Sequence, residues 1–574
     1  MCIRDRLKLG SGTSQHVLVS GKTGSGKSTL LHALVTNLAL RYSPDEIELY
    51  LVDFKQGVEF KTYATHRLPH ARVVAIESDR EFGLSVLGRL DAELKLRADQ
   101  FRVHGVQDLA GYRQANGSAL MPRILLIVDE FQEFFVEDDK ISQDAALLLD
   151  RLVRQGRAFG IHVLLGSQTL AGTYTLSRST IGQMAVRIAL QCSEADAHLI
   201  LSEENSAARL LSRAGEAIYN DTNGLVEGNH PFQVVWLADD RREEYLEQIR
   251  ALAIARGGSA RSQVVFEGNI PADPAQNAPL GELLRSGRPA TSGAAMQAWL
   301  GEAVAIKDPT SATFRRQSGS NLLVVGQNED AALGILATTL VSLLAQHSTA
   351  EATGSRYYIF DGSPAGSPQS ASLALLHDLD PDAVRLVAWR DVPTAVTELA
   401  REVERRQAAD DGDFPPVYVF VHGLQKLRDL RRQEDDFGFS RRGEDLPPQT
   451  AQQFSGVLRD GPAVGVHAIV WCDSVNNLHR AWDRQTFREF EMRVAFQMSG
   501  NDSSTLIDTP AGGKLGTNRA LYHCEEQGIL EKFRPYRWPA ENWLAWVREQ
   551  LHCPAAERDG RPHERPLVAE PPVA

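Results

Sequence analysis

The pattern of apolar and polar positions in the first half of the chain alternates short apolar runs with longer stretches of helical periodicity. Apolar runs predict buried strands over residues 17–19, 47–52, 73–76, 124–128, 160–165, 186–190 and 232–237. Apolar side chains at helical spacing predict helices that begin after residue 28 and span residues 80–103 and 143–157. Continuous apolar strands that alternate with helices are typical of an α/β fold with a mainly parallel central sheet.

The second half of the chain repeats this order about 305 residues later. Apolar runs predict strands over residues 322–325, 357–361, 417–421 and 465–470. Residues 493–502 match residues 187–196 in register, and residues 520–522 repeat residues 217–219. A repeat of this length predicts two tandem domains that share one architecture.

The composition along the chain predicts its division into domains. We expect a first domain over residues 1–250, a linker over 251–300, a second domain over 301–553 and a disordered tail over 554–574. The linker prediction depends on glycine and proline residues with little apolar periodicity. Within the second domain, a polar insertion is expected over 433–449. The tail is rich in proline and charge. Residues 1–6 lack periodicity and lie close to the first strand, so we interpret the chain as truncated at its N-terminus.

The overall composition is that of a soluble globular protein, with 43% hydrophobic and 24% charged residues in 574. We find no signal peptide and no apolar run of about 18 residues that would span a membrane. The five cysteines are widely spaced without a CxxC pair, which favours a reducing compartment over a disulfide framework or a zinc site. A net charge of −13 excludes the bulk basic surface of a protein that coats nucleic acid. It does not exclude a ring that is positive only where a polymer passes.

The segment between the first predicted strand and the first predicted helix has the form of a phosphate-binding loop. It consists of Gly21, Lys22, Thr23, Gly24, Ser25, Gly26, Lys27, Ser28 and Thr29. Its glycines allow backbone N–H groups to surround phosphate oxygens, and the helix N-terminus adds partial positive charge. Lys27 is expected to reach the β- and γ-phosphates, and the Ser28 hydroxyl to bind Mg²⁺. The sequence therefore predicts ATP and Mg²⁺ as ligands.

Two carboxylates, Asp129 and Glu130, follow directly after the predicted strand over residues 124–128. Phosphoryl transfer needs one carboxylate near Mg²⁺ and a second one that orients or deprotonates the attacking water. Asp129 suits the first role, as a metal ligand beside Ser28, and Glu130 suits the second. The alternative is that both side chains only cap the helix that follows. The phosphate-binding loop upstream favours the catalytic interpretation.

Gln168 lies just after the predicted strand over residues 160–165. If that strand is adjacent to the one that carries the carboxylates, the Gln168 amide is placed to sense the γ-phosphate. The alternative is a turn residue that satisfies the backbone.

Residues 151–187 contain arginines but no acidic residue. The arginines are Arg151, Arg154, Arg157, Arg178 and Arg187. Because a guanidinium group matches phosphate oxygens and keeps its proton, Arg187 is a candidate arginine finger that reaches the γ-phosphate of a neighbouring subunit. The alternative is that these arginines pair with the acidic segment over residues 129–150.

The second copy lacks the side chains that would carry this chemistry. Ala332 and Leu333 stand at the positions of the loop lysine and the Mg²⁺ hydroxyl, and His422 and Gly423 replace the two carboxylates. Without a cation, a metal ligand or a base, this copy is not expected to hydrolyse ATP. We expect it to serve structure, regulation or substrate binding.

Together with the phosphate-binding loop and both carboxylates, residues 156–162 (Gly-Arg-Ala-Phe-Gly-Ile-His) and 167–169 (Ser-Gln-Thr) resemble the FtsK/SpoIIIE group of P-loop ATPases. This group includes double-stranded DNA translocases and the EccC-type ATPases of type VII secretion. The resemblance is strong over residues 8–240 and degenerate over 315–540. It implies two tandem RecA-like P-loop domains, the second degenerate, and the roles given above for the loop, Asp129, Glu130, Gln168 and Arg187.

The resemblance also implies partners and a location. Motors of this group act as ring-like homo-oligomers, so we expect self-assembly, with a hexamer as the implied ring. We expect the chain to be cytoplasmic, or held at the cytoplasmic face of the inner membrane by a tether upstream of residue 1.

The cargo is open between two polymers. Double-stranded DNA is the first hypothesis, because most members with a complete phosphate-binding loop and this sensor segment resemble DNA motors. Secreted polypeptide is the alternative, favoured by the tandem array and by residues 53–57 (Asp-Phe-Lys-Gln-Gly) and 68–70 (Leu-Pro-His). No winged-helix module follows the motor, and Thr169-Leu170 stands where DNA translocases carry Arg-Pro. A third hypothesis is a scaffold in which ATP acts only as a switch.

Overall fold

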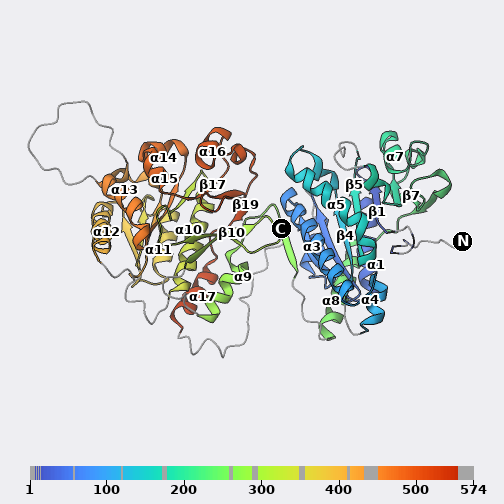
Figure 1. Ribbon diagram of the computed structural model, residues 1–574, viewed down its shortest axis with the longest axis horizontal. Coiled ribbons are helices and arrows are strands. Elements are labelled where there is room, and N and C mark those ends of the chain that lie inside the picture. Colours follow the sequence, from blue (N-terminus) through green and yellow to red (C-terminus); the bar gives the residue numbers. More distant parts are fainter. Residues whose placement is uncertain are drawn as a thin grey trace, which may run out of the picture. The chain divides into compact units, whose positions relative to one another are not determined.

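The computed structural model divides the chain into two compact units, Met1–Asn269 and Ile270–Ala574 (Figure 1). It describes residues 7, 9, 10, 12, 15–55, 59–117, 121–170, 178–256, 263–287, 295–347, 356–409, 414–431 and 450–553. The predictions for residues 1–6, for the end of the 53–57 segment, for the insertion over 433–449 and for the tail lie outside the described residues, as does the side chain of Arg178.

The first unit is built on a nine-stranded sheet with the order β8-β7-β6-β1-β5-β4-β2-β3-β9. The strands are β1 (Val17–Ser20), β2 (Ile47–Asp53), β3 (Ala71–Ile76), β4 (Arg123–Asp129), β5 (Ile161–Ser167), β6 (Val186–Leu190), β7 (Glu216–Asn220), β8 (His230–Gln233) and β9 (Val264–Glu267). From β6 to β9 all neighbours are parallel, and β7 and β8 continue the sheet antiparallel. Strand β1 therefore lies inside the sheet, with β5 between it and β4.

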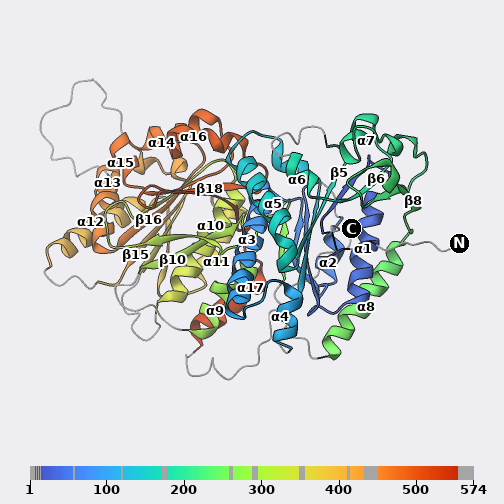
Figure 2. The ribbon, with the colours of Figure 1, turned by 45° about the vertical axis from the view of Figure 1, so that its right-hand side comes forward.

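Helices cover both faces of this sheet (Figures 1 and 2). They are α1 (Lys27–Arg41), α2 (Lys61–Thr65), α3 (Arg80–Val103), α4 (Leu109–Ala115), α5 (Lys140–Phe159), α6 (Arg178–Gly182), α7 (Glu194–Ile200) and α8 (Asp239–Ala255), with short 3₁₀ turns η1 (Phe131–Phe135), η2 (Ala207–Leu210) and η3 (Val226–Gly228). Apolar side chains of α1, α2 and α8 share one core with alternate positions of the strands. Helices α3 and α5 pack side by side on the opposite face.

Local sequence sets both ends of α5, the helix that connects β4 to β5. The Asp139 side chain accepts a hydrogen bond from the Ser142 backbone N–H and so caps the start of the helix. Gly160 ends the helix at φ 69°, a left-handed conformation that glycine adopts without strain, and β5 begins at the next residue.

The second unit repeats the same strand order in a ten-stranded sheet, β11-β10-β19-β18-β17-β12-β16-β15-β13-β14. Its strands are β10 (Met296–Ala303), β11 (Thr310–Phe314), β12 (Leu322–Val325), β13 (Arg356–Asp361), β14 (Val384–Ala388), β15 (Val417–His422), β16 (Val466–Cys472), β17 (Met492–Ala495), β18 (Ala520–Cys524) and β19 (Ile529–Pro535). The run from β18 to β14 corresponds strand by strand to the run from β7 to β3. The predicted α/β fold of two tandem domains with mainly parallel sheets is confirmed.

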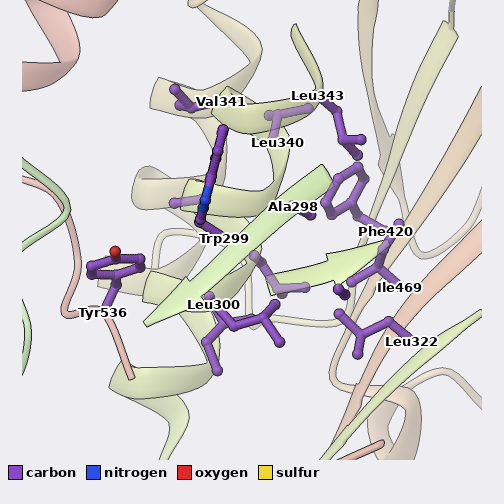
Figure 3. Close-up of a cluster of buried hydrophobic side chains, with 14 of the residues drawn as sticks. Ala298, Trp299, Leu300, Leu322, Leu340, Val341, Leu343, Phe420, Ile469 and Tyr536 are labelled. Atoms are coloured by element: carbon purple, nitrogen blue, oxygen red, sulfur yellow. The ribbon is translucent and has the colours of Figure 1, made fainter. Parts of the chain in front are cut away.

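Helix α10 forms the centre of the second unit. The helices and 3₁₀ turns of this unit are α9 (Ala278–Ser286), α10 (Glu329–Gln346), α11 (Pro368–His377), α12 (Val392–Gln407), α13 (Thr450–Asp460), α14 (Val475–Ala481), α15 (Arg484–Arg488), α16 (Gly500–Ile507), α17 (Glu541–His552), η4 (Pro274–Gln276), η5 (Leu424–Lys426), η6 (Arg428–Leu430), η7 (Pro462–Val464) and η8 (Pro510–Lys514). Side chains of α10 share a core with β10 and the central strands (Figure 3). Within the described residues, α10 alone is long and apolar enough to cross a membrane, a feature that the sequence analysis overlooked. Its 18-residue window is 83% buried, as in the core helix of a folded domain.

The segment that the sequence analysis interpreted as a linker, residues 251–300, is largely structured, so that interpretation is wrong. Helix α8 continues to Ala255, β9 extends the first sheet beside β3, and α9 packs in the core of the second unit. Along the chain, the boundary between the two units lies between Asn269 and Ile270. The local composition concealed these elements because each is short and takes its place from contacts with distant residues.

Gly334 allows α10 to pack against the backbone of residues 536 and 537. A Cβ atom there would collide with the carbonyl oxygen of Tyr536, whereas a Cβ on Gly456 of α13 would meet nothing within 4 Å. We expect Gly334→Ala to lower the unfolding free energy of the second unit by about 2 kcal/mol, since backbone has little room to move. Gly456→Ala is the matched control and should raise it by up to about 1 kcal/mol through helix propensity.

Urea unfolding followed by tryptophan fluorescence measures both effects, because every tryptophan except Trp236 lies in the second unit. Equal stability of the two variants would contradict the close approach at Gly334.

Candidate active site

The phosphate-binding loop connects β1 to α1 at the carboxyl edge of the first sheet. Gly24 and Gly26 have φ values of 79° and 101°, in the left-handed region that glycine adopts without strain. Among the described residues, no side chain caps the start of α1, and its first turn carries no acidic residue. The N–H groups at this helix end are therefore open to an anion, which the helix dipole favours.

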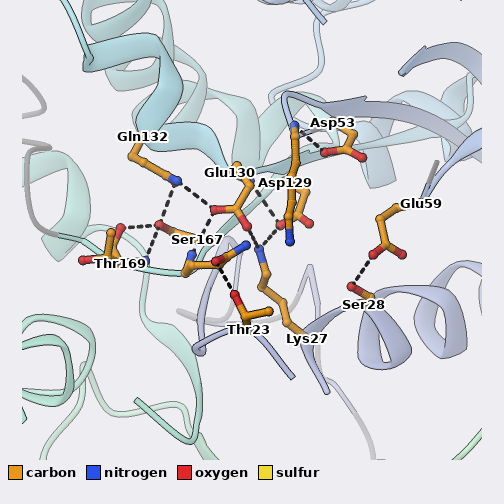
Figure 4. A network of polar contacts seen from close by, with 12 residues as sticks. Thr23, Lys27, Ser28, Asp53, Glu59, Asp129, Glu130, Gln132, Ser167 and Thr169 are labelled. Carbon is orange, nitrogen blue, oxygen red and sulfur yellow. Dashed lines mark hydrogen bonds and ion pairs between the residues drawn. The ribbon is translucent and has the colours of Figure 1, made fainter. Parts of the chain in front are cut away.

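Lys27, the first residue of α1, lies between the two carboxylates that end β4 (Figure 4). Its Nζ is 2.5 Å from Asp129 Oδ1 and 2.6 Å from Glu130 Oε1. The exposed fractions of the three side chains are 7%, 3% and 5%. Burial raises the pKa of Asp129 against the opposing charge of Lys27. At Glu130 burial acts in the same direction, but the Lys27 charge and several hydrogen bonds hold the pKa below its ordinary value.

Glu130 adopts a backbone conformation that a carboxylate residue rarely takes. Its φ is 55° and its ψ is 46°, in the left-handed region. A residue with a Cβ pays about 1–2 kcal/mol for this conformation. The corresponding Gly423 of the second unit has φ 78° and ψ 57° and bears no such cost. The first unit therefore tolerates strain to keep a carboxylate where glycine fits better, which is typical of functional sites.

Gln168 lies beside the phosphate-binding loop. Its Oε1 accepts a hydrogen bond of 2.7 Å from the Thr23 hydroxyl, and its backbone N–H donates to Glu130 Oε2 at 3.1 Å. Gln132 also donates to Glu130 Oε2, at 2.7 Å, and accepts from the Ser167 hydroxyl. Sequence reasoning missed Gln132, whose only signal was its place just after the two carboxylates.

Glu59 is a second residue that sequence reasoning missed. Its Oε1 accepts a hydrogen bond of 2.8 Å from the Ser28 hydroxyl, the predicted Mg²⁺ ligand (Figure 4). His32 lies 3.3 Å from the other Glu59 oxygen and 2.8 Å from the Tyr63 hydroxyl. The His32 hydrogen bond outweighs burial and lowers the pKa of Glu59. Glu59 lies six positions after Asp53, at the same edge of the sheet.

The structure contradicts the prediction that Arg187 is an arginine finger. Arg187 lies in β6 with an exposed fraction of 8%, and its guanidinium donates to the carbonyl oxygens of Ile200 and Leu201 at 3.0 and 2.5 Å. Arg493 of β17 donates in the same way to Leu506 O, at 3.2 Å. Because the second copy lacks the candidate catalytic side chains, this shared contact is structural. Each arginine satisfies the carbonyl end of the helix that follows its strand.

The arginines upstream of Arg187 follow the alternative interpretation in part. Arg151 pairs with Asp91 at 2.8 Å, and Arg154 pairs with Asp150 at 2.8 Å. Asp91 lies on α3, outside the acidic segment that the sequence analysis named. These ion pairs reduce the positive charge that residues 151–187 present to solvent.

The corresponding edge of the second unit is filled by its own side chains. Helix α10 begins at Glu329, only a few residues after β12 ends. Ala332 and Leu333 therefore lie one turn inside this buried helix, whereas Lys27 and Ser28 are the first residues of α1. The Asn328 side chain caps this helix by accepting from Ala331 N–H, and Lys426 donates to Glu329 at 3.2 Å. The helix end that is open in the first unit is thus capped and negatively charged in the second.

His422 occupies the Asp129 position in this second edge. Its ring is buried and stacks on Trp471 at 4.8 Å, and its Nδ1 lies 3.1 Å from the Ser363 hydroxyl. Burial lowers the pKa of His422 to about 4, so the ring is neutral near pH 7. A neutral imidazole in this place supplies no negative charge for a metal ion.

Comparison with known proteins places the first unit in a family. Residues 3–172 match the FtsK/SpoIIIE family. The chain carries an FtsK/SpoIIIE domain. This chain is 31% identical over 214 residues to the ESX-5 secretion system protein EccC5 of Mycobacterium marinum, covering 36% of this chain and 15% of that protein. It is 28% identical over 251 residues to the DNA translocase FtsK of Streptococcus agalactiae, covering 42% of this chain and 29% of that protein. The matches therefore span less than a third of either relative.

Solved structures resemble both units of this chain in fold. The cytoplasmic domain of the type VII secretion ATPase EccC of Thermomonospora curvata gives a TM-score of 0.60 at 19% identity, covering 94% of this chain and 63% of that one. ATPases 2 and 3 of EssC from Geobacillus thermodenitrificans give 0.53 at 14% identity, covering 91% of each chain. These similarities show that the two-unit fold occurs in secretion ATPases.

The buried contacts of Arg187 lead to a stability prediction. We expect Arg187→Ala to lower the unfolding free energy by about 2 kcal/mol, because two buried carbonyl groups lose their donor. Arg493→Ala, the matched change in the second unit, should have a similar effect. Urea unfolding followed by circular dichroism measures both variants.

Mixing two variants separates a structural role of Arg187 from a role as an arginine finger. Folded Arg187→Ala protein should keep its ATP turnover, and mixing it with Lys27→Ala protein should add none. Loss of turnover in Arg187→Ala that returns in the mixture would reinstate Arg187 as a finger that acts between subunits.

Proposed function

We propose that the first unit binds and hydrolyses ATP with Mg²⁺ and that the second unit does not. The observation that carries this proposal is the contrast between the two helix ends at the same place in the repeated fold. The end of α1 is uncapped and holds Lys27 beside two buried carboxylates, whereas the end of α10 is capped by Asn328 and carries Glu329. An anionic phosphate chain fits the first arrangement and is repelled by the second.

Each residue of the first site has a role that its position supports. Lys27 and the loop N–H groups would hold the phosphates, and Gln168 would contact the γ-phosphate from beside Thr23. Ser28 and Asp129 supply the hard oxygen donors that Mg²⁺ prefers, and the bound ion would offset phosphate charge. Glu130 would orient and deprotonate the attacking water, because its lowered pKa keeps the carboxylate ionised and able to accept a proton. The hydrogen bond from Gln132 holds its second oxygen in place.

We also propose that hydrolysis drives a polymer through a ring of copies of this chain. The FtsK/SpoIIIE domain supports a motor, and the strained backbone of Glu130 supports turnover rather than a pure ATP switch, which would need no base. A ring-like homo-oligomer, with a hexamer as the first expectation, would work in the cytoplasm or at the cytoplasmic membrane face.

The described structure favours polypeptide over double-stranded DNA as the cargo. A DNA motor needs positive charge where the polymer passes. Within residues 151–187, however, Arg151 and Arg154 are paired with acids and Arg187 is buried. The relatives include both a secretion protein and a DNA translocase, and ATPases 2 and 3 of the Thermomonospora curvata EccC were solved with a signal sequence peptide.

Substitution of the first site tests the ATPase proposal. Lys27→Ala and Glu130→Gln should each reduce steady-state ATP turnover by more than about 100-fold, because each removes a group that acts on the reacting phosphate or water. Lys426→Ala, at the corresponding edge of the second unit, is the control and should leave turnover unchanged. A phosphate-release assay measures all three variants, and turnover that survives both first-unit changes would refute the assignment.

Stimulation of turnover identifies the cargo. A helical peptide with a secretion signal should raise ATP turnover, whereas double-stranded DNA should have little effect at physiological salt. If DNA stimulates instead, and the stimulation falls steeply as salt rises, the DNA hypothesis is the correct one.

A further inference from the structure

Asp53 ends β2 at the same sheet edge as the proposed ATP site. Strands β2 and β4 are parallel neighbours, and their register places Asp53 beside Asp129. Residues paired in this way direct their side chains to the same face of the sheet. Asp53 is fully buried, and Figure 4 shows it next to Asp129, on the side toward Glu59 and Ser28. A buried carboxylate therefore adjoins the predicted metal ligands without contacting Lys27.

One oxygen of Asp53 lacks a partner in the described part of the chain. Its Oδ1 accepts a hydrogen bond of 2.9 Å from the Lys55 backbone N–H, but its buried Oδ2 accepts none. Burial raises the pKa of Asp53 to about 7, and the negative charges of Asp129 and Glu59 act in the same direction. An unpartnered buried carboxylate is costly, so a donor or cation from outside the protein would stabilise it.

The second unit offers an internal comparison at the same position. Asp361 ends β13, and the register places it beside His422. Its Oδ1 accepts from the Ser363 backbone N–H at 2.7 Å, and its Oδ2 accepts from the Ser370 hydroxyl at 2.7 Å. The protein thus satisfies both oxygens where no nucleotide site is built. In the first unit it leaves one oxygen open beside the site proposed for Mg²⁺.

We propose that Asp53 is a positioning residue that accepts a hydrogen bond from a water molecule bound to the Mg²⁺ of the ATP site. This inference depends on the proposed function, in which Ser28 and Asp129 hold the ion. Mg²⁺ usually keeps several of its waters, and carboxylates outside its direct ligands orient them. The described residues contain no group of three or more acidic, histidine or cysteine side chains placed to bind a metal directly. An outer role therefore fits Asp53 better than direct coordination.

The gain in nucleotide affinity on adding Mg²⁺ tests this role without depending on turnover. A fluorescent ATP analogue is titrated into wild-type, Asp53→Asn and Asp361→Asn protein, with Mg²⁺ and with EDTA. In the wild type Mg²⁺ should tighten binding. In Asp53→Asn this gain should fall at least about fivefold, because a charge-assisted hydrogen bond to the bound water is lost. Affinity in EDTA should stay within about twofold, and Asp361→Asn should match the wild type.

The outcomes separate this inference from the proposed function. If the wild type gains affinity with Mg²⁺ and Asp53→Asn keeps the full gain, Asp53 has no role toward the ion and only this inference is refuted. If the wild type binds no nucleotide, or gains nothing from Mg²⁺, the proposed function fails and this inference fails with it. Asp53→Ser, measured in the same way, replaces Asp53→Asn if circular dichroism shows that the asparagine variant does not fold.

Discussion

The contact of Lys27 with Asp129 and Glu130 is the interaction on which the first unit depends. This contact joins the start of α1 to the end of β4. Helix α1 follows β1, and β5 lies between β1 and β4 in the sheet. All three charges are nearly buried, and burial of charge is costly unless partners compensate it closely. Two carboxylates share one ammonium group, and the adjoining helix end is open. The arrangement is therefore suited to a further anion together with a cation, as in a Mg²⁺–ATP complex.

The repeated fold separates what packing requires from what chemistry requires. Both copies keep the arginine that binds the carbonyl end of a helix, Arg187 and Arg493. Both keep a buried histidine that contacts a backbone carbonyl, His162 and His467. Both have a residue in the left-handed conformation directly after the corresponding strand, Glu130 after β4 and Gly423 after β15. The packing contacts thus occur in both copies, whereas among the described residues the charged groups of the proposed nucleotide site occur in the first copy alone.

Most of the fold and the centre of the site could be predicted from the sequence, because their signals are local. The apolar runs located β1 to β6, and the glycine-rich loop and the acidic pair after β4 located Lys27, Asp129 and Glu130. The rest depends on contacts between residues far apart in the chain. Glu59 reaches Ser28 only through the fold, and the burial of Arg187 follows from the position of α7. In the second copy α10 begins soon after β12, so the loop between strand and helix is shorter than in the first copy. An alignment of the two repeats without gaps does not reveal this shortening.

The stoichiometry of nucleotide binding tests the central claim most directly, that one fold is present twice and carries one nucleotide site. Equilibrium dialysis of the full chain against a non-hydrolysable ATP analogue with Mg²⁺ measures this number. The account predicts one nucleotide per chain at saturation. Two nucleotides per chain, or none, would contradict it.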